Sequence, residues 1–204
     1  MLKYLFFLIL IIAVISLILT GLHLYKISNK NKEHMSKYVD DVKFDNNLGK
    51  VLVVYYSLSG NTRNIAENIK NKTNADIYEI RTAEKIKANP KFYLTVKKQL
   101  REGKYPEIFD DLPDMSKYDI IFVGSPVWWY TVSTPVLSFL KKADFHGAKI
   151  VPFSTQGSNV GTFLKDFQHN AKHAKVFGYE AFNNLPKKYN KEVDNRISAW
   201  LNSL

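Results

Sequence analysis

The sequence contains no cysteine among its 204 residues. Disulfides, thiolate metal sites, cysteine nucleophiles and iron–sulfur clusters are therefore excluded, because each of them requires a cysteine sulfur. Internal repeats and low-complexity segments are also missing from the sequence. Any redox chemistry of this protein must therefore reside in a bound cofactor rather than in its own thiols.

Two common nucleotide-binding signatures are absent as well. No segment matches the GxGxxG pattern of dinucleotide-binding folds, and none matches the phosphate-binding pattern that ends in Gly-Lys-Ser/Thr. The sequence therefore does not support a nicotinamide dinucleotide as the first ligand, and it does not support nucleoside triphosphate hydrolysis.

The charge of the chain is strongly positive, with 29 Lys and Arg against 19 Asp and Glu and a net charge of +10. These basic residues are spread along the whole chain and interspersed with acids, unlike the basic stripe of a nucleic-acid binder. We therefore expect no nucleic acid partner. Anionic lipid headgroups or an anionic ligand explain the basic surface more simply.

An uncharged run from Tyr4 to Leu22 opens the chain. As an α-helix, this run is long enough to span a bilayer, and Tyr4 and Tyr25 stand where aromatic side chains favour the membrane interface. A cleaved signal peptide is the alternative interpretation. The run is longer than the apolar core of most signal peptides, and no small-x-small cleavage site is evident. We therefore expect a retained membrane anchor.

The two flanks of this run differ in charge. Upstream lies only Lys3, and the downstream lysines are Lys26, Lys30, Lys32 and Lys37. Because basic flanks stay in the cytoplasm, we expect a single-pass protein of the cell membrane with a cytoplasmic domain; the extracellular side is the alternative. The next residues are polar and lack hydrophobic periodicity. The predicted organisation is an anchor at residues 1–27, a polar tether at 28–48 and a folded domain at 49–204.

The folded domain alternates between two kinds of segment. Short β-branched and aromatic runs predict strands at residues 50–56, 76–80, 118–124, 148–154 and 175–182. Apolar residues at helical spacing predict helices at 62–72, 89–102, 135–142, 159–171 and 189–204. We expect the break Gly124-Ser125-Pro126 to end the third strand. The alternation predicts an α/β fold with a doubly wound, five-stranded parallel sheet, preceded by a single transmembrane helix.

Three loops leave the same edge of such a sheet, where ligands bind. The first consists of Ser57, Leu58, Ser59, Gly60, Asn61 and Thr62. Its hydroxyls precede a helix, whose free N–H groups and dipole favour an anion. We predict that this loop binds a phosphate group without Lys or Arg, and an ordinary helix cap is the alternative.

The second loop contains Pro126, Val127, Trp128, Trp129 and Tyr130. Three consecutive large aromatic residues cannot all point into the core, so at least one is available to stack on a flat ring. The alternative is that they cover the sheet edge or form a homodimer contact. The third loop begins Thr155, Gln156, Gly157 and Ser158. Its N–H groups can bond to the heteroatoms of a ring, and a plain Gly-rich connection is the alternative.

From residue 50 to 204 the sequence resembles the flavodoxin family in three motifs. Residues 55–63 read Tyr-Tyr-Ser-Leu-Ser-Gly-Asn-Thr-Arg, residues 124–129 read Gly-Ser-Pro-Val-Trp-Trp, and residues 152–158 read Pro-Phe-Ser-Thr-Gln-Gly-Ser. Residues 86–108 are similar to the insertion that this group carries after its second strand. The resemblance implies a flavodoxin-like sheet with strand order 2-1-3-4-5.

The resemblance also implies FMN as the cofactor. Its 5′-phosphate is expected in the loop at 57–62, and its ring between the loop with Trp128 and Trp129 and the loop at 155–158. Either tryptophan is a candidate for stacking on the ring. Typical flavodoxins are acidic whereas this chain is basic, so the usual partner surface does not transfer.

The implied function is electron transfer at a membrane, by an FMN-dependent oxidoreductase or electron carrier. The expected partners are a redox protein or a quinone-like small molecule, with NAD(P)H as one donor. The flavin performs such chemistry, so we expect no catalytic side chain. A sensor or interaction module that binds FMN without turnover is the alternative. A protein that binds a phosphate ester without flavin is a third hypothesis.

Two histidines invite a metal interpretation. His169 and His173 are spaced one helical turn apart, but no third ligand is evident in the sequence. We therefore expect two solvated histidines on one helix face and no metal site.

Overall fold

The structure is a computed structural model that describes residues 2–157 and 159–204. Ser158, one of the residues expected at the ligand site, lies outside this described part. The chain forms two compact units, Met1–Val42 with Leu185–Arg196 and Lys43–Asn184 with Ile197–Leu204. The predicted boundaries at residues 27 and 48 stay predictions.

The first unit contains the N-terminal helix α1 (Leu2–Met35) and a short 3-10 turn, η1 (Ser36–Tyr38). One helical segment, Lys3–Tyr38, is long and apolar enough to cross a membrane. The helix continues past Ser28 into the segment that was expected to be a tether. Good helix formers such as Lys and Glu extend a helix once it has formed. Residues 39–49 then form neither helix nor strand.

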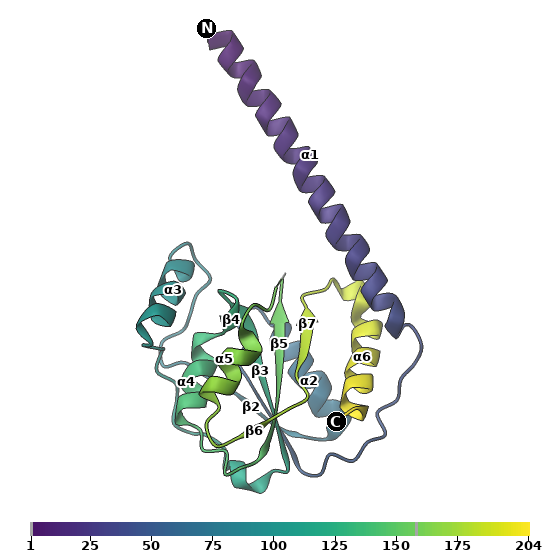
Figure 1. Cartoon of the computed structure of the whole chain (residues 1–204), viewed down its shortest axis with the longest axis vertical. Helices are drawn as coiled ribbons and strands as arrows, with labels where there is room; N and C mark the ends of the chain where they lie inside the picture. Colours follow the sequence, from purple (N-terminus) through teal and green to yellow (C-terminus); the bar gives the residue numbers. More distant parts are fainter. Residues whose placement is uncertain (1, 158) are drawn as a thin grey trace. The chain divides into compact units, whose positions relative to one another are not determined.

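The second unit is built on a parallel sheet with the strand order β2-β1-β3-β5-β6 (Figure 1). The strands are β1 (Val51–Tyr55), β2 (Asp76–Glu79), β3 (Ile120–Trp128), β4 (Thr131–Val132), β5 (Lys149–Gln156), β6 (Lys175–Val176) and β7 (Glu180–Asn183). The helices after α1 are α2 (Asn61–Thr73), α3 (Phe92–Glu102), α4 (Thr134–Lys142), α5 (Phe163–Asn170) and α6 (Asn190–Asn202). The predicted fold and strand order are confirmed.

Alternate residues of the strands are buried on opposite faces of the sheet, because successive side chains of a strand point to opposite sides. One set, which includes Val54, Ile121 and Val123, packs in a cluster with buried residues of α4 and α5. The other set includes Phe122 and Phe153, whose rings meet Trp200 of α6 at 5.4 and 6.4 Å between centroids. Helices therefore cover both faces of the sheet (Figure 1).

The expected fifth strand is split in two. Both β6 and β7 pair in parallel with β5, and residues 177–179 interrupt them. Gly178 has a φ of +63° there, and its carbonyl accepts a 2.6 Å hydrogen bond from the Trp200 indole nitrogen. Because this carbonyl accepts from a side chain of α6, it does not take part in the sheet, and the strand is interrupted there.

The expectation that Gly124-Ser125-Pro126 ends the third strand is wrong. β3 continues to Trp128, and its partner in β5 stays in register as far as the pair Pro126 and Thr155. Gly124 allows close packing, because a Cβ there would lie 2.1 Å from the Phe153 ring. The strand then pairs antiparallel with β4, which the sequence did not indicate.

Candidate ligand site

The ends of three strands create the site. β1 ends at Tyr55, β3 at Trp128 and β5 at Gln156, and these strands run parallel as neighbours in the sheet. Their carboxyl ends therefore lie at one edge, as a doubly wound fold requires for a ligand site. All three predicted segments begin at or near this edge.

The loop between β1 and α2 forms a small cradle around its own backbone. Gly60 has a φ of +92°, a conformation that favours glycine, and its N–H donates to Ser57 Oγ at 3.1 Å. The first helical hydrogen bond of α2 runs from Asn64 N to Gly60 O at 2.9 Å. The backbone N–H groups of residues 61–63 precede that bond and have no partner within the helix. They can bind an anion, and the helix dipole favours one there.

Arg63 stands next to this cradle but is engaged elsewhere. Its guanidinium contacts Glu79 at 2.6 Å and the Tyr55 hydroxyl at 3.3 Å. The hydrogen bond to Glu79, followed by the one to Tyr55, raises the pKa of Arg63. An anion in the loop would therefore be bound by amides and hydroxyls, as the sequence predicts.

One hydrogen bond joins the first predicted segment to the third. The hydroxyls of Thr62 and Thr155 lie 2.8 Å apart, and both side chains are buried. A buried hydroxyl pair of this kind satisfies both groups and fixes the distance between the elements that carry them. The N-terminus of α2 and the end of β5 are therefore parts of one local structure.

Two adjacent tryptophans have different environments. Trp128 is 9% exposed, and its ring meets Tyr56 at 5.6 Å and Phe92 at 4.8 Å, edge to face in both cases. Burial, followed by the nearby charge of Glu79, raises the pKa of Tyr56 to about 12. Trp129 is 42% exposed, and its indole nitrogen donates to the Tyr93 carbonyl at 2.9 Å. Trp129, rather than Trp128, can offer a ring face to a ligand.

Trp129 and Tyr130 form a tight turn between β3 and β4. Trp128 pairs with Thr131, so only two residues connect the strands, and their φ angles are +49° and +62°. Hairpins of this length prefer Asn and Gly, because bulky residues in the left-handed region cost about 1–2 kcal/mol each. The Tyr130 carbonyl accepts a 2.8 Å hydrogen bond from Thr162 N, which helps to hold the turn. Strained residues of this kind cluster at functional sites.

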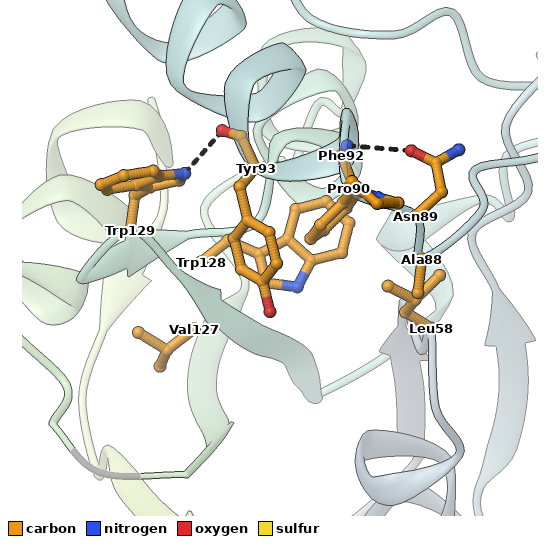
Figure 2. Close-up of a pocket in the computed structure, with 9 residues that line it drawn as sticks. All are labelled: Leu58, Ala88, Asn89, Pro90, Phe92, Tyr93, Val127, Trp128 and Trp129. Carbon is orange, nitrogen blue, oxygen red and sulfur yellow. Dashed lines mark hydrogen bonds between the residues drawn. The ribbon is translucent and has the colours of Figure 1, made fainter. Parts of the chain in front are cut away.

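Two cavities open beside this turn. The larger, about 560 Å³, is lined by Leu58, Ala88, Asn89, Pro90, Phe92, Tyr93, Val127, Trp128 and Trp129. The smaller, about 310 Å³, is lined by Tyr93, Val127, Trp129, Tyr130, Gln156, Gly157 and Asn159. Figure 2 shows the larger cavity, with the Trp129 nitrogen directed at the Tyr93 carbonyl. The cavities share three residues and are mostly apolar and aromatic, as sites for flat organic ligands are.

Gln156 is a polar residue in the wall of the smaller cavity. Hydrogen bonds fix both ends of its side-chain amide. Its Oε1 accepts from Ser154 at 3.0 Å, and its Nε2 donates to Asn183 at 3.1 Å. The Ser154 hydroxyl also lies 2.7 Å from that of Tyr179. An amide fixed at both ends keeps one Nε2 hydrogen for a ligand atom that accepts hydrogen bonds.

The predicted site residues divide into two groups. Those that line a cavity are Leu58, Val127, Trp128, Trp129, Gln156 and Gly157. Those that line neither cavity, in the described part of the chain, are Ser57, Ser59, Gly60, Asn61, Thr62, Pro126 and Thr155. The second group belongs mainly to the cradle between β1 and α2.

Sequence reasoning did not place at the site five residues that line the larger cavity: Ala88, Asn89, Pro90, Phe92 and Tyr93. All five come from the segment before and at the start of α3. The Asn89-Pro90 turn followed by two aromatic residues is the sequence signal that points to this segment. Strand order alone does not indicate that it reaches the site.

Among residues 2–157 and 159–204, no group of three His, Asp or Glu side chains could hold a metal ion. The expectation that His169 and His173 share a helix face is wrong, because α5 ends at Asn170 and His173 has a φ of +58°. No Asp, Glu, His or Lys is among the described residues that line either cavity.

Comparisons with known proteins agree with this geometry. A family model for flavodoxin matches residues 50–203. A flavoprotein from Lactobacillus acidophilus NCFM, solved in complex with FMN, is 28% identical, with 65% of this chain and 92% of that chain covered and a TM-score of 0.60. A putative flavoprotein from Bacteroides uniformis is 24% identical, with 75% and 97% covered and a TM-score of 0.64. At that identity the likeness shows the fold alone. No curated protein matches the sequence.

Proposed function

The chain belongs to the flavodoxin family, and from this premise we propose that it is a flavoprotein that binds FMN and transfers electrons as an oxidoreductase or electron carrier. The observation that carries the proposal is the hydrogen bond between Thr62 and Thr155. It brings an anion-binding helix N-terminus and an aromatic cavity wall into one site. A ligand with a phosphate at one end and a flat ring at the other fits both parts.

The residues of the site fit FMN part by part. The amides of residues 61–63 and the hydroxyls of the cradle would hold the phosphate. The exposed face of Trp129 and the backbone at Gly157 border the smaller cavity, where the ring would lie against aromatic and apolar surface. The fixed amide of Gln156 would donate to a ring heteroatom. The flavoprotein from Lactobacillus acidophilus binds FMN at 28% identity, which supports the same ligand here.

When bound, FMN supplies the transfer of one or two electrons through its ring. The protein then has three tasks: to bind the phosphate, to orient the ring, and to keep water from it. The lining of the smaller cavity would perform the last task with Tyr93, Val127 and Trp129. No carboxylate, His or Lys is among the described lining residues, so these walls offer none of those three groups for proton transfer.

A membrane location is part of the proposal. The uncharged run in α1 supports a single-pass anchor, and the lysines that follow it support a cytoplasmic domain. Because the chain has no cysteine, a single Glu67→Cys on α2 can be labelled selectively. Labelling by a membrane-impermeant maleimide only after cell lysis is expected. Labelling in intact cells would place the domain outside.

An FMN titration of the purified full chain in detergent tests the proposal. The expected result is a yellow protein with flavin absorbance bands. Loss of the Trp129 ring by Trp129→Ala should weaken FMN binding about tenfold or more, because stacking on an aromatic ring stabilises by about 1–3 kcal/mol. Leu94→Ala is the matched control, since Leu94 is exposed beside the site but lines neither cavity. A colourless chain that does not bind added FMN would refute the proposal.

Turnover is tested separately. NADH or NADPH should bleach the flavin bands if either is the donor, and a quinone should restore them if it is the acceptor. A flavin that binds tightly but exchanges electrons with none of these, nor with a redox protein, would favour the sensor or interaction module instead.

A further inference from the structure

A basic segment lies next to the larger cavity. Between Lys85 and Lys104 the sequence contains seven basic residues and one acidic residue, Glu102. All seven basic side chains are exposed. In the part of the chain that the structure describes, only Arg101 among them forms an ion pair, with Glu102. The segment therefore carries a local positive charge that the protein itself does not balance.

The same segment exposes large apolar side chains. On α3, Tyr93 is 64% and Leu94 71% exposed, and the neighbouring turn exposes Trp129 and Tyr130. These side chains adjoin one another, because Trp129 bonds to the Tyr93 backbone and Tyr93, Trp129 and Tyr130 line one cavity. We refer to Tyr93, Leu94, Trp129, Tyr130, Lys91, Lys97, Lys98 and Arg101 together as the aromatic-basic rim.

Exposed apolar residues are rare elsewhere in this unit. Among its described residues, the only other exposed large hydrophobic side chain is Phe109, which stands alone under the guanidinium of Arg81 at 5.0 Å; the Lys97 ammonium lies over the Trp129 ring in the same way, at 5.1 Å. The apolar exposure is thus concentrated at the aromatic-basic rim. Concentrated apolar exposure on a soluble domain marks an interaction surface.

Helix geometry separates the two sides of α3. Val96 is buried, and Phe92 and Leu100 pack beside it against the core. Leu94, Lys98 and Arg101 recur at spacings of three and four residues, so they share the outward side. The outward side thus combines Leu94 with basic side chains, as amphipathic helices that lie in a membrane interface do.

We propose that the aromatic-basic rim binds an anionic lipid surface. Tyr and Trp favour the headgroup layer, Leu94 would enter the apolar boundary, and the lysines can extend their stems along the surface and meet lipid phosphates. The apolar helix α1 belongs to the same chain. As a membrane anchor it would keep the rim close to the bilayer, so that the effective concentration of lipid at the rim is high. This inference rests on the proposed membrane anchoring but not on FMN binding. Both cavities border the rim, so an acceptor dissolved in the bilayer would reach the site directly.

A fluorescent label at one position of α3 tests the proposal. Leu94→Cys, labelled with an environment-sensitive fluorophore, is studied in the full chain in lipid nanodiscs. In phosphatidylcholine mixed with phosphatidylglycerol, the label should move to an apolar environment and shift its emission to the blue. In phosphatidylcholine alone, the shift should be much smaller. The same label at Glu67→Cys, on α2, is the control and should not respond.

Charge reversal provides the second arm. Lys91→Glu with Lys98→Glu should weaken the lipid response of the Leu94 label about tenfold, because basic residues near an anionic surface act cumulatively. Lys70→Glu with Lys165→Glu changes the net charge equally on α2 and α5 and should leave the response intact. High salt should also abolish the shift in the unmodified background, which requires no variant to fold.

Three outcomes would overturn the proposal. The first is that the emission does not shift in anionic nanodiscs, and the second is that it shifts equally in both lipids and salt does not reduce the shift. The third is that the emission shifts only when an acidic protein is added. The last outcome would assign the rim to a protein partner. FMN titration of the same samples distinguishes this failure from that of the proposed function, because the label responds to lipid whether or not flavin is bound.

Discussion

The cradle at residues 57–62 and the turn at Trp129 and Tyr130 both contain left-handed backbone, but with different residue types. Both follow strands at one edge of the sheet, and both require a positive φ. The cradle places glycine there, at Gly60, and avoids steric cost. The turn places two large aromatic residues there and accepts strain. The difference indicates that the cradle needs no side chain at its left-handed position, whereas the turn keeps its side chains despite the cost.

The surroundings of the turn support this view. Hydrogen bonds at the Trp129 indole and the Tyr130 carbonyl hold it, and Gly161 lies so close that a Cβ there would be 2.3 Å from Tyr130. Strain persists only where neighbouring structure over-determines it. The preceding residue, Trp128, is buried and has no positive φ, so one of the three consecutive aromatic residues packs in the core and the other two are exposed at a cavity.

The largest expected effect tests the division between the tryptophans. Trp128→Ala should lower the free energy of unfolding by about 3–5 kcal/mol, because it leaves a cavity between Tyr56 and Phe92. Trp129→Ala should change it by less than about 1 kcal/mol, because this residue is 42% exposed and its removal leaves no enclosed cavity. Denaturant unfolding of the flavin-free chain measures both. Equal losses would mean that the two rings have the same structural role.

Tyr56, which packs against the buried Trp128, predicts that the stability of the fold depends on pH. The folded-state pKa of Tyr56 is about 12 and the ordinary value is 10.0. The stability that this group contributes is fully present below pH 10 and is lost as pH rises through 12. The raised pKa corresponds to about 2–3 kcal/mol. Tyr56→Phe should therefore flatten the decline in stability between pH 10 and 12, measured by denaturant unfolding, and an unchanged slope would contradict the assignment.

Alanine at Gly60 tests the cradle. Gly60→Ala should cost about 1–2 kcal/mol of stability through φ strain alone, because no atom lies within reach of the added methyl group. It should also weaken FMN binding. Gly103→Ala is the matched control, with φ +65° and equally open space at the end of α3. If both variants bind FMN like the unmodified chain, the cradle does not hold the phosphate.

The smallest effect concerns the strain in the turn. Tyr130→Gly should be about 0.5–1 kcal/mol more stable than Tyr130→Ala, because glycine removes the left-handed cost while the unfolded chain gains some entropy. Both variants lose the same ring, so their difference in thermal unfolding isolates the backbone. A glycine variant that is less stable than the alanine variant by about 0.5–1 kcal/mol would mean that the turn is not strained, because only the entropy of the unfolded chain would then separate the two.

Much of the fold was predictable because buried parallel strands are continuous apolar runs. The run from Ile120 to Val123 and the run from Val51 to Tyr55 identify two central strands without further information. Strand ends were not predictable in the same way. In the sequence, Gly124 is typical of a residue that ends a strand. In the structure, its missing Cβ leaves room for the ring of Phe153, which belongs to the neighbouring strand and is distant in sequence.

The candidate site, too, was only partly predictable from the sequence. Loop composition predicted a phosphate-binding helix N-terminus, since its chemistry is local to residues 57–62. The choice between Trp128 and Trp129 was not local, because it depends on Tyr56 from β1 and Phe92 from α3. The contribution of α3 to the cavities also depends on packing between distant segments.

The sequence by itself determined the α/β class, the apolar N-terminal run, the absence of thiol chemistry and the three segments at one sheet edge. Each of these follows from residue types and spacing along a short stretch. Only the tertiary structure decided which aromatic ring is free, how the Thr62 and Thr155 hydroxyls join two loops, and how a basic helix comes to border the cavities. These features arise from contacts between segments distant in the chain, and local pattern carries no information about which of them meet.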